Sequence, residues 1–313
     1  MQEADFLEQF KRLAAERARR IYPEDQAENF VNQLFQELEL FPRPSEQDYH
    51  CRLWNEQDVI LISYGDSICQ QGRTPLQSLC SFLEQHLAGL ISIVHLLPFF
   101  PSSSDDGFAV IDYLQVNPEL GDWSQVTALD RNFDLMVDLV INHISSQHHW
   151  FQQFLRNEQP GKNYFITPPE SANLEYVVRP RQSPLLTEVE TAGGPAKVWT
   201  TFSADQVDVD FSNPEVLLEY VRILLFYLRQ GARFIRLDAV AFLWKEWGTG
   251  CLNLPQTHEV VKLLRDLLGA VAPKTVLLTE TNLPHQQNMS YFGDSDEAHM
   301  VYQFSLAPLL LHG

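Results

Sequence analysis

The sequence predicts an α/β fold of the (β/α)8 barrel class, with about six of its strands present. Six short apolar runs rich in β-branched residues alternate with segments of helical periodicity, and they occupy residues 59–64, 90–97, 133–141, 232–240, 275–280 and 300–306. Continuous apolar runs of this kind are typical of buried parallel strands joined by helical crossovers. Because a complete barrel has eight strands, we expect an incomplete barrel within these 313 residues.

Residues 1–50 predict a helical extension ahead of the barrel, which we assign to residues 51–313. Apolar side chains recur at helical spacing twice, first at Leu7, Phe10, Leu13 and Ala14, then at Phe30, Val31, Leu34, Phe35 and Leu38. The prolines at 42 and 44 end this part.

Two further features organise the barrel segment. A helix is predicted to begin at Ser212-Asn213-Pro214, where a capping residue precedes a first-turn proline, and to end at Gly231. The stretch from about 144 to 211 is too long and too polar for an ordinary loop. We expect it to form a small subdomain inserted after the third strand.

Composition and charge exclude several classes of protein. The formal net charge of −19 repels phosphate backbones, so we expect no nucleic-acid partner. No apolar run is long enough to span a membrane, and the N-terminus reads as a charged amphipathic helix rather than a signal peptide. We therefore expect a cytoplasmic protein without a membrane partner. Its cysteines, Cys51, Cys69, Cys80 and Cys251, lack paired spacing and predict reduced thiols.

Polar residues close four of the predicted strands. Asp105 follows the second run, His143 the third and Glu280 the fifth, while Arg236 and Asp238 end the fourth. In a parallel barrel these strand ends converge on one mouth. Each residue also has a structural interpretation, as a helix cap, a core histidine or a buried ion pair. Four such ends on successive strands favour a functional site over coincidence.

The carboxylates of this set suit glycosyl transfer. Arg236 and Asp238 are two residues apart on one strand and share a face, so the guanidinium is expected to keep Asp238 ionised as a nucleophile. Glu280 follows an apolar strand, which is expected to keep its carboxyl protonated as an acid. One carboxylate to attack and one to give a proton is the arrangement of retaining glycosidases, whose carboxyl groups lie about 5 Å apart.

These segments together resemble the α-amylase family of glycoside hydrolases. Asp138-Leu-Val-Ile-Asn142-His143 matches its DxVxNH pattern, Arg236-Leu-Asp238 matches its RxD nucleophile segment, and Glu280 its fifth-strand acid/base. Within the family, residues 96–113, 198–214 and 242–259 resemble the group of phosphorylases that act on sucrose, sucrose 6-phosphate or glucosylglycerate. The likeness extends from about residue 50 to the end of the chain.

The resemblance implies roles for further residues. It places Asp105, Phe108, His143 and Arg236 around the donor glucosyl ring, with Gln206 nearby and Phe108 as an apolar platform. Arg179 and Arg181 are the candidates to bind phosphate, because a guanidinium matches phosphate oxygens; their structural alternative is a solvated surface pair.

The resemblance also implies parts that these 313 residues do not contain. They are a later-strand aspartate and a C-terminal β domain, so we interpret the chain as C-terminally truncated. It implies no metal and no cofactor.

The sequence therefore predicts a retaining α-glucoside phosphorylase. Such an enzyme transfers a glucosyl unit from sucrose or a related glucoside to inorganic phosphate and yields α-glucose 1-phosphate. Two alternatives stay open: a hydrolase of the α-glucosidase or amylase type with the same carboxylates, and an inactive truncated remnant of such an enzyme.

Overall fold

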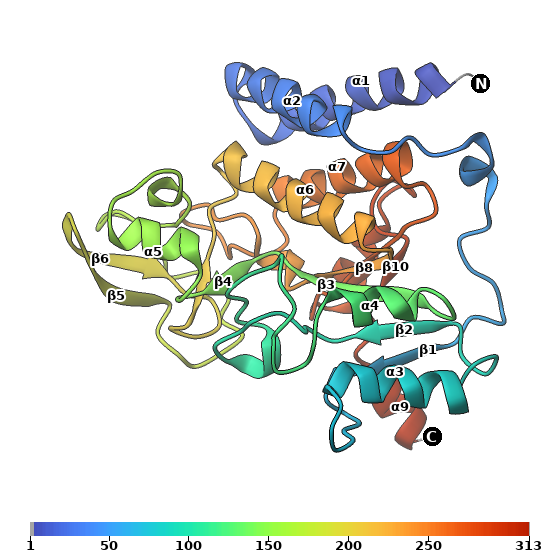
Figure 1. Cartoon of the computed structure of the whole chain (residues 1–313). Helices are drawn as coiled ribbons and strands as arrows, with labels where there is room; N and C mark the ends of the chain where they lie inside the picture. Colours follow the sequence, from blue (N-terminus) through green and yellow to red (C-terminus); the bar gives the residue numbers. More distant parts are fainter. Residues whose placement is uncertain (1–2, 313) are drawn as a thin grey trace.

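The computed structural model describes residues 3–312 and is built around a six-stranded parallel sheet (Figure 1). The strand order is β1-β2-β3-β8-β9-β10. Their bounds are Ile60–Ser63, Ile93–Leu96, Asp134–Val140, Ala232–Asp238, Val276–Thr279 and Met300–Val301. All neighbouring strands pair in parallel. The six predicted strands and the partial barrel are thus confirmed, although the last strand is shorter than its apolar run.

The sheet has two faces of different character. On the face that we call the inner face, buried residues from the four middle strands, two of them from β9, form an apolar floor that comprises Ile93, Met136, Phe234, Val276 and Leu278. Both outer strands pair on one side only, and Ile60 and Ile62 of β1 are 39% and 49% exposed. The inner face therefore lies open at its edges.

Helices cover the opposite face. They are α3 (Pro75–His86), α4 (Trp123–Leu129), α6 (Pro214–Arg229) and α7 (Pro255–Val271). The predicted cap of α6 is present, since the Glu215 N–H donates to Asn213 Oδ1 at 3.0 Å. Gly231 follows with φ +91°, a value that only glycine adopts without strain. Both ends of α6 therefore lie where the capping residue and the glycine in the sequence predict them.

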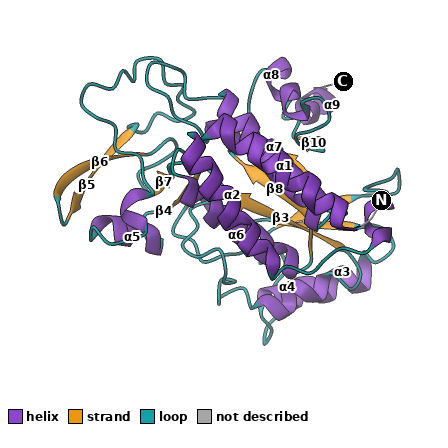
Figure 2. Ribbon diagram, turned by 90° about the horizontal axis from the view of Figure 1, so that it is seen from above, coloured by secondary structure: helices purple, strands orange, loops and turns teal. Residues whose placement is uncertain are grey.

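The N-terminal helices α1 (Glu3–Ile21) and α2 (Glu24–Glu39) form a further layer on α6 and α7 (Figures 1 and 2). Helix α1 contacts α7, and α2 contacts α6. Their predicted apolar faces are turned inward, with Phe10, Ala14, Phe30 and Leu34 buried. No helix within residues 3–312 combines the length and the apolar character needed to cross a membrane.

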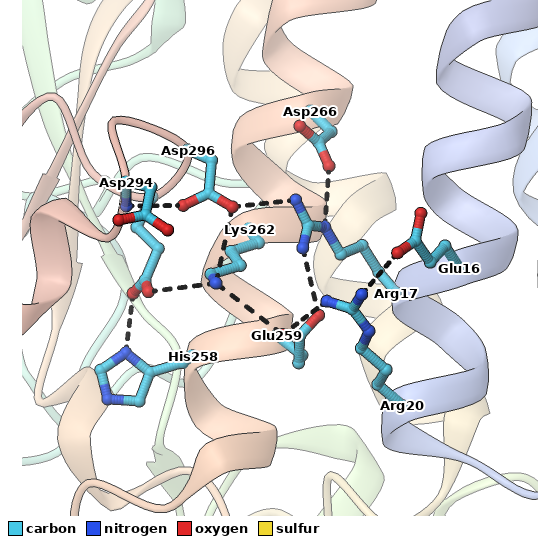
Figure 3. A network of polar contacts seen from close by, with 10 residues as sticks. Glu16, Arg17, Arg20, His258, Glu259, Lys262, Asp266, Asp294 and Asp296 are labelled. Atoms are coloured by element: carbon cyan, nitrogen blue, oxygen red, sulfur yellow. Dashed lines mark hydrogen bonds and ion pairs between the residues drawn. The ribbon is translucent and has the colours of Figure 1, made fainter.

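An ionic network holds α1 on α7 (Figure 3). The Arg17 guanidinium lies 3.2 Å from Asp266, 3.5 Å from Glu259 and 3.0 Å from Asp296. Lys262 joins the same group, at 3.9 Å from Glu259 and 3.5 Å from Asp296. The Arg17 side chain is only 10% exposed, so α1 is fixed by charges that lie largely out of water.

The predicted insertion after β3 has its own small sheets. Strand β4 (His143–Ser145) pairs antiparallel with β7 (Gln206–Asp208), and β5 (Leu186–Thr191) forms a hairpin with β6 (Gly194–Trp199). Helix α5 (His149–Leu155) lies beside the hairpin. The remaining helices are α8 (His285–Met289) and α9 (Leu306–His312), with 3₁₀ turns at 46–50, 105–107, 161–163, 240–242 and 290–292.

Candidate active site

A cavity of about 560 Å³ lies at the carboxyl ends of the strands, between the sheet and the insertion. Eight of the nine residues predicted for the site line it: Asp105, Phe108, His143, Arg181, Gln206, Arg236, Asp238 and Glu280. Arg179 is exposed and does not line it. The strand-end reasoning therefore located one cavity.

Arg236 is the centre of the charged part of this cavity. Its Nη1 atom donates to Asp238 Oδ1 at 3.0 Å and also to Asp138 Oδ1. Its Nη2 atom lies 4.0 Å from Glu280 Oε2. These carboxylates raise the pKa of Arg236 above its ordinary value, despite burial, which lowers it. One guanidinium is thus shared by three carboxyl groups.

The charge state of Asp238 differs from the sequence expectation. Burial raises the pKa of Asp238 to about 8, with the charges of Glu280 and Asp138 adding to the effect and Arg236 opposing it. Arg236 alone was expected to keep this carboxyl ionised. Burial outweighs the effect of Arg236, which also contacts the fully buried Asp138, whose pKa lies below its ordinary value. Asp238 therefore binds its proton more tightly than an ordinary aspartate does.

The backbone after Asp238 helps to position Glu280. Ala239 has φ +51°, and its N–H donates to Glu280 Oε2 at 2.9 Å. Asp105 and Asp106, on the facing loop, have φ of 55° and 50°. Non-glycine residues in this region are strained by about 1–3 kcal/mol each and concentrate at functional sites. All three line the cavity, which indicates a surface shaped for a ligand.

Neutral hydrogen-bonding groups form another wall. Gln206 Nε2 donates to Asp105 Oδ2 at 2.8 Å and lies 3.1 Å from His143 Nε2. Burial lowers the pKa of His143 to about 4, more than the nearby Asp208 and Asp105 raise it. Phe108 places its ring 5.7 Å from the Arg236 guanidinium carbon. An apolar ring beside amide, imidazole and carboxylate groups suits a sugar ring with its hydroxyl rim.

A buried ion pair supports this wall from behind. Lys245 Nζ lies 2.7 Å from Asp208 Oδ2 and donates to Asn142 Oδ1 at 2.9 Å. Asp208 also accepts the Thr201 N–H at 2.8 Å. Lys245 and Asp208 come from different segments, so the sequence offered no signal for this pair. It joins the end of β3, the insertion and the turn after β8.

The loop that carries the two predicted phosphate ligands lines the cavity through Val178, Pro180 and Arg181. The Val178 N–H donates to the Gly250 carbonyl oxygen at 3.0 Å, which anchors the loop to the segment after β8. Within residues 3–312 the Arg181 guanidinium has neither a hydrogen bond nor an ion pair, and it lines the cavity. Arg179 instead points its Nη2 atom at the Arg181 carbonyl oxygen, 3.5 Å away.

Sequence reasoning missed other lining residues, among them Tyr64, Asp106, Thr281 and Asn282. Tyr64 ends the first apolar run, and Asn282 follows Glu280 by two residues, so the strand-end rule could have found both. The described residues contain no group of three or more His, Cys, Asp or Glu side chains arranged to hold a metal ion.

This fold is that of a family of sugar-processing (β/α)8 enzymes. The catalytic domain of α-amylase matches residues 85–311. The chain therefore belongs to the α-amylase family.

Several similar proteins are phosphorylases by name. The chain is 52% identical over 271 residues to the glucosylglycerate phosphorylase of Spirochaeta thermophila, with 86% of this chain and 46% of that protein covered. It is 49% identical over 261 residues to that of Escherichia coli, at 83% and 47% coverage. A crystal structure of sucrose 6F-phosphate phosphorylase from Thermoanaerobacter thermosaccharolyticum superposes with a TM-score of 0.72 at 28% identity, covering 82% of this chain and 54% of that one. The chain spans about half the length of the curated relatives it matches.

Proposed function

We propose that this chain carries the glucosyl-transferring site of a retaining α-glucoside phosphorylase. The observation that supports this most is the sharing of Arg236 between Asp238 and Glu280 on one cavity wall. A nucleophilic carboxylate and an acid/base beside it are the two groups that retaining transfer requires.

The proposed reaction has two steps. Asp238 attacks the anomeric carbon while the bond to the leaving oxygen breaks and that oxygen takes the proton of Glu280. A phosphate oxygen then attacks the same carbon, gives its proton to Glu280 and releases Asp238, so that α-glucose 1-phosphate forms with retention. In this scheme Asp105, His143 and Gln206 hold the sugar hydroxyls, and Phe108 packs on a face of the ring.

Phosphate is proposed to bind at Arg181, with Arg179 supporting the loop. An unpaired guanidinium makes stronger hydrogen bonds to an anion such as phosphate than to neutral water. Arg181 therefore favours phosphate over water as the acceptor. The donor is proposed to be glucosylglycerate, after the relatives named above, with sucrose as the second donor to test.

The test is a product assay on the purified chain. Each donor is incubated with inorganic phosphate, and α-glucose 1-phosphate and free glucose are measured by proton and phosphorus NMR. Release of α-glucose 1-phosphate supports phosphorolysis and identifies the donor. Free glucose alone identifies a hydrolase, and the absence of both products, from a folded chain, identifies a remnant without activity.

A further inference from the structure

A buried histidine lies next to the Arg236 cluster on the inner face of the sheet. His95 is on β2, and its neighbour in the parallel register is Met136 of β3, two residues before Asp138 on the same face. Asp138 in turn pairs in register with Arg236 of β8. The side chains of His95, Asp138 and Arg236 thus follow one another across three adjacent strands.

Hydrogen bonds connect these side chains to the nucleophile. His95 Nε2 lies 2.9 Å from Asp138 Oδ2, while the other oxygen of Asp138 accepts from Arg236 Nη1. The same Nη1 donates to Asp238 Oδ1 at 3.0 Å. His95 and Asp138 are 1% and 0% exposed, so solvent does not replace the bond between them.

The second nitrogen of His95 identifies its tautomer. Nδ1 is buried and has no hydrogen-bond partner among the described residues. Burying an N–H donor without an acceptor costs more free energy than burying a nitrogen lone pair without a donor, because the donor gives up its hydrogen bond to water and gains none. The neutral ring with its hydrogen on Nε2 satisfies the geometry: Nε2–H donates to Asp138, and Nδ1 carries the lone pair.

The occupied oxygen of Asp138 restricts how this carboxylate meets Arg236. Arginine and carboxylate prefer a bidentate fork, in which two guanidinium nitrogens meet two carboxylate oxygens. Asp138 meets Arg236 through one oxygen and one nitrogen, because His95 holds the other oxygen. Nη2 is thereby left facing Glu280, and Nη1 keeps its bond to Asp238.

We propose that His95 is a positioning residue for glucosyl transfer: its Nε2–H caps one oxygen of Asp138 and so keeps Arg236 shared with Asp238 and Glu280. The inference rests on the proposed function for its catalytic meaning. Without this cap, Asp138 closes a bidentate fork on Arg236 and draws the guanidinium from the nucleophile. His95 touches neither substrate nor reacting atoms in this scheme.

Three substitutions separate the hydrogen bond from packing. H95Q places an amide N–H where Nε2 stands, H95N places one where Nδ1 stands, and H95F keeps an aromatic ring without a donor. The readout is the rate of glucosyl-ester formation on Asp238 from α-glucosyl fluoride, followed by intact mass after quenching. Fluoride leaves without a proton, so this rate reports on the nucleophile and not on Glu280.

We expect H95N and H95F to react about 10- to 100-fold more slowly at saturating donor, with little change in half-saturating concentration, and H95Q to stay within about threefold of the parent chain. If His95 serves packing alone, the loss of rate in each variant should follow its loss of melting temperature. It should then not depend on whether the new side chain has a donor at the position of Nε2. Parent-like rates in H95N and H95F overturn the proposal.

A spectroscopic arm makes the outcome independent of activity. In the 15N-histidine-labelled chain, the His95 signal, identified by its loss in H95Q, should show a protonated Nε2 and an unprotonated Nδ1. A charged ring or an Nδ1–H tautomer overturns the inference. If the chain is folded and His95 shows the expected tautomer but no glucosyl ester forms, the proposed function is wrong. The hydrogen bond from His95 Nε2 to Asp138 is then still supported.

Discussion

Replacing Asp238 with asparagine is expected to stabilise the protein, and more so at high pH. The folded-state pKa of about 8 lies above the unfolded value of 3.8, so the folded chain keeps a proton that the unfolded chain has lost. The resulting penalty is absent below about pH 4, grows as pH rises to about 8 and is constant above that. Asparagine keeps an oxygen for Arg236 and carries no charge to bury.

The magnitude follows from the shift. At 1.36 kcal/mol per pKa unit the penalty is on the order of 5 kcal/mol at pH 8 and about 1–2 kcal/mol at pH 5. An unfolding entropy of about 2.1 cal/mol/K per residue converts 1 kcal/mol into about 1.5 °C for a chain of 313 residues. D238N should therefore melt about 5–8 °C higher at pH 8 and about 2–3 °C higher at pH 5.

The matched control is the same substitution on the neighbouring strand. Asp138 is bound by both His95 and Arg236, which lower its pKa against the effect of burial. D138N removes the partner of a buried cation, which costs about 3–5 kcal/mol and lowers the melting temperature by about 5–8 °C. Differential scanning fluorimetry from pH 5 to pH 8 measures both variants. A D238N melting temperature at or below that of the parent at pH 8, or a gain that does not vary with pH, refutes the reasoning.

Glucosyl transfer should increase as pH rises toward about 8, because Asp238 must lose its proton before it can attack as the nucleophile; initial rates against pH measure this, and a rate that falls steadily between about pH 6 and about pH 8 contradicts it. R181Q should reduce phosphorolysis at least about tenfold while R179Q changes it by less than about threefold, as phosphate saturation curves would show, and equal effects would discredit the assignment of Arg181. K245M should lower the melting temperature by about 5–8 °C, because Asp208 is left charged and buried, whereas K197M, which breaks an exposed pair, should change it by about 1 °C or less.

Much of the fold is predictable because the strands are buried on both faces. Val276–Thr279 and Ala232–Asp238 are apolar runs bounded by turn signals, and both became strands within two residues of the predicted ends. The last run became only Met300–Val301. The hairpin of β5 and β6 lies within the predicted inserted subdomain, and Ala192-Gly193 between alternating residues signals its turn.

The site was predictable where one strand carries the residues. Arg236 and Asp238 share a face by spacing alone, and the contact between them follows. The protonation of Asp238 was not predictable, because it depends on Asp138 from another strand and on burial that spacing does not report. The loop conformation that brings Arg181, and not Arg179, to the cavity depends equally on a distant segment.

Ion pairs that hold α1 on α7 should make the attachment of this outer layer weaker at high ionic strength. Dissolved salt weakens pairs that reach the surface, such as Arg17 with Asp296, which is 32% exposed, and hardly affects the apolar contact of Phe10. Local opening of a protein proceeds through its least stable units. At high salt the detachment of α1 from α7 should thus become the easiest such opening, and it uncovers one side of a helix while the strands beneath keep their pairing.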